Sequence, residues 1–223
     1  MTETTVPLLS LAETRVLGVL IEKQQTVPDT YPLSLNSLLA GCNQKSSRDP
    51  VLELADGDVL AALGRLRELG LVDEVFGNRV TRYEHFFGKA LQIPSQSVAL
   101  LAVLMLRGPQ TAGELRLNCE RLHRFSDISA VEGFLEELAG RPAGALAIKL
   151  PRQPGSREAR WAHLLSGDVD VSAPQPVAAA RGGSGEVAEL RAEVAALGEE
   201  VARLKTLLAR VCGELGIAAD AAD

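Results

Sequence analysis

Apolar residues recur at steps of three and four through the first part of the chain, which is the spacing of one helix face. Ser10 and Glu13 form a capping box, so a first helix is expected to begin at Leu11. Two further helices are expected over Leu33–Cys42 and Asp56–Leu69, and Gly70 stands where helices commonly end in a left-handed residue. The side chains expected to face inward are Leu11, Val16, Leu17, Leu20, Ile21, Leu35, Leu38, Leu39, Val59, Leu60, Leu63, Leu66 and Leu69.

Two β-prone runs then flank a Gly77-Asn78 pair, the signal of a two-residue hairpin. Three helices and a hairpin are the order of a winged helix, a helix-turn-helix unit with a wing. The order recurs: Ser95 can cap a helix through Leu106, Thr111 begins a second, Asp127–Ala139 forms the third, and "ALAIKL" and "ARWAHLL" read as strands. The pattern predicts an α+β fold, mainly α with small β-hairpins, made of two tandem winged-helix domains, residues 1–88 and 89–166.

The last quarter of the chain changes character. Residues 167–185 are rich in Pro, Ala, Gly and Ser, which predicts a flexible linker. Residues 186–217 then predict a coiled-coil helix and a homodimer, or alternatively a single helix that folds back on its own domains. The heptad seam expected to dimerise consists of Val187, Leu190, Val194, Leu197, Val201, Leu204, Leu208, Val211 and Leu215.

Composition and the apolar runs argue against a membrane-spanning or secreted protein. The longest apolar run, Val98–Leu106, is too short to cross a bilayer, which needs about 20 residues. No basic secretory n-region precedes Glu3, and the three cysteines lack disulfide or zinc-site spacing, so a soluble cytoplasmic protein is expected. The net charge of −6 is uneven: residues 89–166 hold 10 Lys and Arg against 7 Asp and Glu, while both flanking parts are acidic. Attraction for phosphate should concentrate there.

Four strings carry a resemblance to a known family. At "NQKSSRDPVLEL", "RYEHFF", "RGPQTAGELR" and "LPRQPGSREARWAHLL" the chain resembles the YceH-like family of bacterial proteins, from about Leu9 to Gly167. The resemblance implies a tandem winged-helix fold. It brings no catalytic residues, because the family is generally described as uncharacterised.

The polar octet "NQKSSRDP", residues 43–50, is a candidate contact for nucleic acid because it precedes the third helix, whose N-terminus meets base edges in DNA-bound modules. Asn43 and Gln44 can pair with adenine, while Lys45, Ser46, Ser47 and Arg48 can hold phosphates. The competing interpretation is a loop whose polar side chains bond its own backbone.

The wings supply further cations. The DNA-binding residues expected from the octet and the wings are Asn43, Gln44, Lys45, Ser46, Arg48, Arg79, Arg82, Lys149, Arg152, Arg157 and Arg160. Arg116, Arg121, His123 and Arg124 gather around the second helix of the second repeat. Alternatively, these arginines pair with Glu132, Glu136, Glu137 or Glu158. Both third helices have acidic outer faces, which argues against inserting them into a groove.

Enzyme chemistry finds little support, since the histidines are isolated and no Gly-rich phosphate loop follows a strand. No cofactor or metal is expected. Two hypotheses remain: a dimeric winged-helix protein that binds double-stranded DNA, as a transcriptional regulator or nucleoid-associated factor, or a protein–protein adaptor that binds an unidentified partner protein instead.

Overall fold

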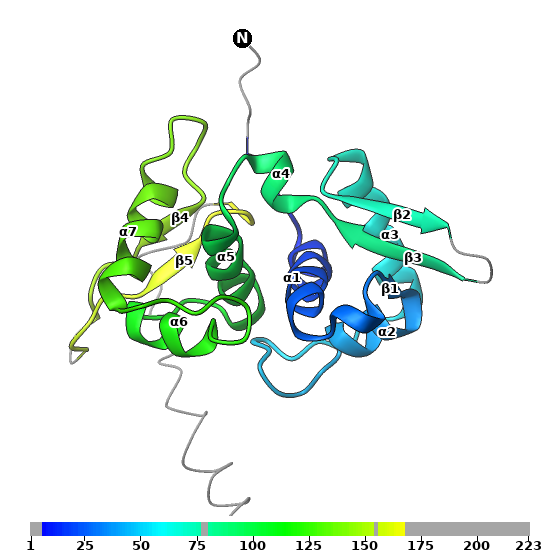
Figure 1. Ribbon diagram of the computed structural model, residues 1–223, viewed down its shortest axis with the longest axis horizontal. Coiled ribbons are helices and arrows are strands. Elements are labelled where there is room, and N and C mark those ends of the chain that lie inside the picture. The colour runs from blue at the N-terminus through cyan, green and yellow to red at the C-terminus, as the bar shows by residue number, and fades with distance from the viewer. Residues whose placement is uncertain (1–5, 77–79, 154–155, 168–223) are drawn as a thin grey trace, which may run out of the picture. The chain divides into compact units, whose positions relative to one another are not determined.

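A computed structural model describes residues 6–76, 80–153 and 156–167 (Figure 1). These residues belong to one compact unit, residues 1–171. The predicted linker beyond Gly167, the predicted coiled-coil helix 186–217 with its heptad seam, the Gly77-Asn78 turn and Arg79 lie outside the described residues. The division into two domains at residue 88 stays a prediction.

The first half consists of three helices followed by an antiparallel pair of strands. The helices are α1 (Leu11–Thr26), α2 (Leu35–Cys42) and α3 (Asp56–Glu68), with a 3-10 turn, η1 (Pro28–Thr30), after α1. Strand β3 (Thr81–His85) lies between β2 (Val72–Phe76) and β1 (Leu33–Ser34), and both pairings are antiparallel. The capping box is present as predicted, because Glu13 N–H donates to Ser10 Oγ while Ser10 N–H donates to the Glu13 carboxylate.

The second half repeats this order after a short helix that the sequence pattern did not predict, α4 (Phe87–Leu91). Helices α5 (Ser95–Arg107), α6 (Ala112–Asn118) and α7 (Ile128–Ala139) are followed by the antiparallel strands β4 (Ala147–Lys149) and β5 (Trp161–His163). The second predicted capping box, Thr111 with Glu114, is also present. The described residues thus form a mainly helical α+β structure with seven α-helices and two small antiparallel sheets.

Helices α1 and α5 pack against each other at the centre and join the two halves (Figure 1). A run of consecutive residues is buried on each helix, from Thr14 to Ile21 on α1 and from Ser97 to Leu106 on α5. The close approach explains Gly18: a Cβ atom there would lie 3.0 Å from the Leu106 side chain. The buried apolar side chains of both halves therefore belong to one continuous core.

Several details differ from the sequence expectation. Leu11 is 49% exposed and Leu60 is 46% exposed, because each lies on the solvent side of its helix although the spacing fits an inward position. Ser95 does not cap α5; it is the first helical residue, and Pro94 occupies the cap position. The second helix begins at Leu35, since Leu33 and Ser34 pair with β3.

Gly70 takes the left-handed backbone conformation predicted for it, with φ +68°. Within the residues that the structure describes, no helix is both long and apolar enough to cross a membrane; α5, which contains the apolar run Val98–Leu106, has 13 residues.

Candidate nucleic-acid interface

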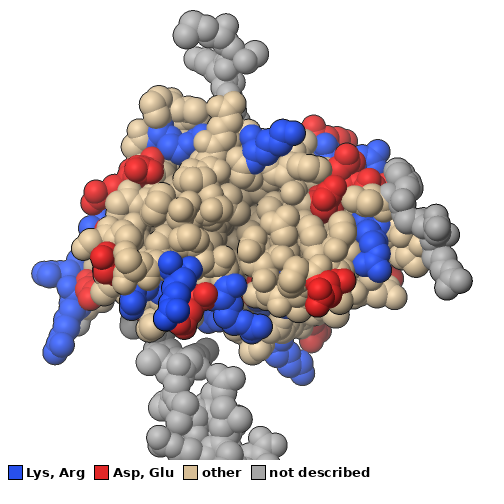
Figure 2. Space-filling view, in the orientation of Figure 1, with Lys and Arg blue, Asp and Glu red and all other residues tan. Residues whose placement is uncertain are grey.

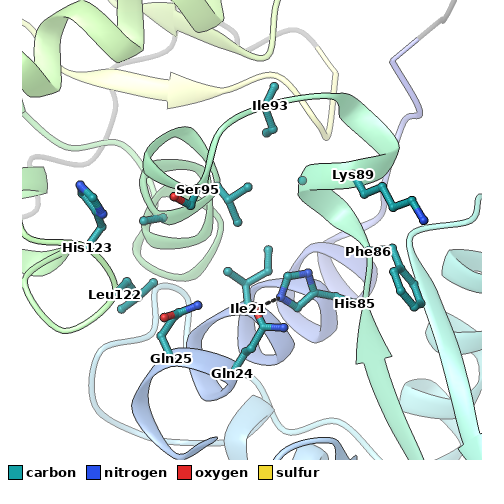
Figure 3. A pocket seen from close by; sticks show the side chains of 13 residues that line it. Ile21, Gln24, Gln25, His85, Phe86, Lys89, Ile93, Ser95, Leu122 and His123 are labelled. Carbon is teal, nitrogen blue, oxygen red and sulfur yellow. Dashed lines mark hydrogen bonds between the residues drawn. The ribbon is translucent and has the colours of Figure 1, made fainter.

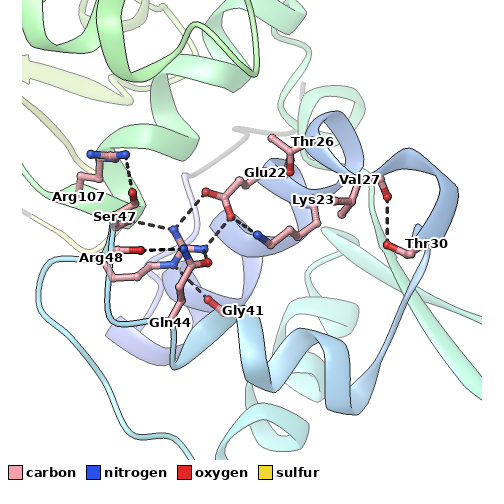
Figure 4. Close-up of polar contacts among 11 residues, drawn as sticks. Glu22, Lys23, Thr26, Val27, Thr30, Gly41, Gln44, Ser47, Arg48 and Arg107 are labelled. Atoms are coloured by element: carbon pink, nitrogen blue, oxygen red, sulfur yellow. Dashed lines mark hydrogen bonds and ion pairs between the residues drawn. The ribbon is translucent and has the colours of Figure 1, made fainter. Parts of the chain in front are cut away.

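The octet loop is organised around a buried arginine. Arg48 is 6% exposed and makes a two-pronged ion pair with Glu22 of α1, at 2.7 and 3.1 Å (Figure 4). Its Nε donates to the Gly41 carbonyl at 3.1 Å, and Nη1 also donates to its own neighbour, the Ser47 carbonyl, at 2.9 Å. The pKa of Glu22 lies below its usual range because the bonds and charge of Arg48 outweigh the opposing effect of burial. Arg48 is therefore a structural cation that no phosphate can reach.

The same loop is fastened to the central helices. Arg107 of α5 donates to Ser47 Oγ at 2.7 Å (Figure 4). Asp49 N–H donates to the Leu106 carbonyl at 2.8 Å. From α1, the fully buried Arg15 donates to the carbonyls of Cys42 at 3.0 Å and Pro50 at 2.5 Å. The loop thus joins α2 to both helices of the central pair.

The amide of Asn43 is also used internally. Its Oδ1 accepts from Leu54 N–H and its Nδ2 donates to the Leu54 carbonyl, both at 2.8 Å. Asn43 and Arg48, both expected to contact DNA, are bonded to groups of the fold itself in this structure. Gln44 bonds Ser46 and Arg48, whereas Lys45 and Ser46 are exposed.

The expected wing cations divide into two groups. Arg82 donates to the carbonyls of Thr30 and Pro32, and Arg160 bonds the Pro109 carbonyl and lies 3.5 Å from Glu114. Lys149 lies over the ring of Trp161, with 5.3 Å between its ammonium and the ring centroid. By contrast, Arg152 and Arg157 are exposed and have no hydrogen-bond or ion-pair partner within the described residues.

Figure 2 shows Lys and Arg side chains along the lower edge of the molecule, over α6, the loop after α2 and the loop between β4 and β5, with acidic side chains between them. Five exposed cations of the two loops and of the turn after α6 have no carboxylate partner within the described part of the chain: Lys45, Arg121, Arg124, Arg152 and Arg157. We call these five residues the cationic edge.

The third helices differ from this edge. On α3 the exposed Arg65 is paired with Glu68 at 3.1 Å, and Asp58 is exposed beside the N-terminus. On α7 the exposed charges are carboxylates, including Glu136 and Glu137. The outward acidic face expected from the sequence is present on α7, so a phosphate backbone would be repelled there, whereas the exposed charges of α3 are mixed.

Two cysteines and two histidines of the fold are held neutral. Burial raises the pKa of the Cys42 and Cys119 thiols to about 12, as befits cysteines that fill core space. Burial also lowers the pKa of His85 and His163 to about 4. Among the described residues, no three His, Cys, Asp or Glu side chains are grouped closely enough to hold a metal ion.

Acidification is expected to destabilise the fold through these histidines. Their folded pKa of about 4 lies below the ordinary 6.5, so the unfolded chain binds more protons between these values. Their contribution to stability is complete above about pH 6.5 and is lost toward pH 4, at up to about 1.4 kcal/mol per histidine per pH unit. Urea unfolding at about pH 7, 6 and 5 measures this slope. The double variant His85→Gln, His163→Gln should have a flatter profile, and an equally steep one would refute the assignment.

Comparisons with known proteins identify the family of this chain. A model of the family described as "Protein of unknown function, DUF480" matches residues 9–177. The chain belongs to this DUF480 family. It is 62% identical over 202 residues to a UPF0502 protein of Dechloromonas aromatica, with 91% of this chain and 95% of that protein covered. A UPF0502 protein of Leptothrix cholodnii is 57% identical over 219 residues, covering 96% and 98%. The expected membership of an uncharacterised bacterial family is confirmed, under the names DUF480 and UPF0502.

Proposed function

We propose that this DUF480 protein binds double-stranded DNA through the cationic edge and that residues 1–88 and 89–166 are two winged-helix domains. Two features support the winged-helix proposal. Each half has three helices followed by an antiparallel strand pair, and each second helix begins with a side-chain cap, Ser34 or Thr111. A role as a transcriptional regulator or nucleoid-associated factor fits such a protein.

One observation carries the DNA proposal: the five cations of the edge have no partner within the described residues, whereas the exposed arginines of α3 and β3 are bonded to carboxylates or backbone carbonyls. Arg65 and Arg67 of α3 are bonded to Glu68 and Glu74. No carboxylate within the described residues neutralises the edge in this way, so its charges remain available to phosphates. Affinity for DNA comes largely from the release of counterions by such cations.

The mode of binding follows from the same residues. Contacts by Lys and Arg to phosphates position a protein on the duplex without reading its sequence. The acidic outer face of α7 keeps base-reading side chains out of the groove, and Asn43 is occupied by Leu54. We therefore expect binding that tolerates changes in base sequence.

A homodimer formed through residues 186–217 would double the number of contacts with DNA. Sedimentation of a chain ending at Leu165 tests this part of the proposal, and that chain is expected to be monomeric.

A salt series tests the proposal. Fluorescence anisotropy with a labelled duplex should give a dissociation constant that rises steeply with salt, with a logarithmic slope of about 0.9 for each phosphate contact. The triple variant Lys45→Ala, Arg152→Ala, Arg157→Ala should lower that slope by about 2.7. The matched control Arg65→Ala, Arg67→Ala removes two exposed but paired cations and should leave the slope unchanged. A full-length protein that fails to retain DNA at about 50 mM salt would rule out the DNA proposal.

The second candidate is a protein–protein adaptor. The specific observations in its favour are the acidic outer face of α7 and the exposed Leu60 on α3, since apolar and acidic side chains suit a partner protein better than a phosphate backbone. Loss of DNA binding with retention of a co-purifying partner after nuclease treatment would favour this candidate.

A further inference from the structure

A cavity of about 430 Å³ lies between the two halves of the described unit (Figure 3). Helices α1, α4 and α5 form its walls, and the turn that follows α6 closes one side through Leu122 and His123. Cavities that hold small molecules are commonly of this size and occur preferentially where two domains meet. None of the roles considered above uses it.

The walls combine apolar surface with a few polar groups. The apolar side chains come from α1, from α5, from the segment that joins α4 to α5 and from the turn after α6: Ile21, Val98, Ala99, Ile93 and Leu122. Gln24 of α1 places its amide group beside the imidazole of His85, Gln25 places a second amide near Leu122, and Ser95 lies at the opposite wall (Figure 3). Such a surface suits a ligand with apolar faces and a polar edge.

His85 is held in place and has unused bonding capacity. Its backbone N–H donates to Tyr31 Oη at 2.8 Å, and its ring Nε2 is 3.0 Å from Gln24 Oε1. The other ring nitrogen, Nδ1, is buried and has no hydrogen-bond partner within the described residues. The lowered pKa keeps the ring neutral near pH 7, so when Nε2–H donates to Gln24, Nδ1 is a free acceptor.

The cavity offers an ionic ligand no side chain of opposite charge. Among the described residues that line it none is acidic, and its lysine, Lys89, is exposed with an ammonium group that points away from the other lining side chains (Figure 3). A charged ligand would therefore lose its hydration without gaining an ion pair. The ligand that fits is uncharged.

We propose that this cavity binds a small, uncharged, planar heteroaromatic molecule of purine size. The apolar walls would cover the faces of the ring. The amides of Gln24 and Gln25 would pair with its donor and acceptor edge, as glutamine pairs with two adjacent groups of adenine. His85 would orient the Gln24 amide through the bond between its Nε2 and Gln24 Oε1.

The turn after α6 connects the cavity to the cationic edge. Leu122 and His123 line the cavity, while Arg121 and Arg124, their immediate neighbours in the same turn, belong to the edge. A ligand that fixes this turn would change the presentation of both arginines. This coupling rests on the proposed function, whereas the binding itself does not.

The test uses the full chain with adenine, guanine and adenosine as probes. Saturation-transfer difference NMR with each probe at about 1 mM should show transfer to the ring protons of at least one, with a dissociation constant below about 1 mM by titration. Gln24→Leu removes the amide, and Ser95→Trp fills the cavity from an exposed position that the core does not need. Each should weaken binding at least about ten-fold, while thermal unfolding verifies that the variants are folded.

Lys89→Met is the matched control, because its ammonium points away from the cavity. Unchanged affinity in this variant supports an uncharged ligand, and weaker binding would overturn that assignment. Absence of transfer from every probe, or transfer unaltered in both Gln24→Leu and Ser95→Trp, would overturn the proposal. DNA binding is measured separately, so purine binding in a protein that does not bind DNA would refute the proposed function alone.

Discussion

Replacing Arg48 with alanine is expected to lower the free energy of unfolding by about 3 kcal/mol, the lower end of the usual cost of breaking a buried ion pair. Glu22, whose side chain is 16% exposed, would lose both bonds from the guanidinium and keep only Lys23 at 3.2 Å. The substitution also removes the bonds from the guanidinium to the carbonyls of Gly41 and Ser47. Each orphaned group adds a desolvation cost. Urea denaturation of the full chain, followed by circular dichroism, measures the change in midpoint.

Lys45→Ala is the matched control for this prediction, since Lys45 belongs to the same loop and is exposed with no polar partner in the described part of the chain. It should change the free energy of unfolding by less than about 0.5 kcal/mol. DNA affinity should separate the two variants as well. Lys45→Ala should weaken DNA binding although the protein keeps its normal stability. Equal free energies of unfolding for Arg48→Ala and Lys45→Ala would contradict a stabilising role for the Arg48–Glu22 ion pair.

The parts of the fold that depend on local chemistry could be predicted from the sequence. The two capping boxes, Ser10 with Glu13 and Thr111 with Glu114, join groups three residues apart, so the sequence spacing alone specifies the geometry. Gly70 takes a left-handed conformation that glycine adopts at little cost. The order of helices and strands followed from such signals together with the apolar spacing.

The octet loop could not be interpreted in the same way. Its residues are polar and were expected either to contact nucleic acid or to bond the loop's own backbone, yet Arg48 is buried against Glu22, which lies 26 positions earlier. Nothing near Arg48 in the sequence identifies its partner, because the pairing forms only when α1 and α2 pack. A usable signal was the presence of Arg15 and Glu22 on a helix that is otherwise apolar toward the core, since a buried charge requires a partner.

Apolar spacing also overestimates burial at the edges of the fold. Leu60 fits the inward pattern of α3, but the neighbours that would cover it are absent from the described residues, and it remains 46% exposed. Whether a face is covered depends on the next element in space. The cavity wall shows the same limit, because Gln24, His85 and His123 come from segments far apart in the sequence and no spacing rule connects them.

Phe87→Ala is expected to lower the free energy of unfolding by about 3–5 kcal/mol, the usual cost of removing a buried phenylalanine. Phe87 is 0% exposed and belongs to α4, a helix of five residues that the sequence pattern did not predict. A helix this short is unstable alone, so α4 must be held by the side chains it buries, Phe87 and Leu91. Loss of Phe87 should therefore loosen the segment that connects the two halves.

The neighbouring residue provides the control, since Phe86 has the same side chain but is 36% exposed and borders the cavity. Phe86→Ala loses less buried area and should cost no more than about 1.5 kcal/mol. Urea denaturation of both variants gives the comparison, and hydrogen exchange of the amides in α4 should rise with Phe87→Ala alone. Similar losses in the two variants would mean that α4 is held by its backbone connections and that Phe87 does not anchor it to the core.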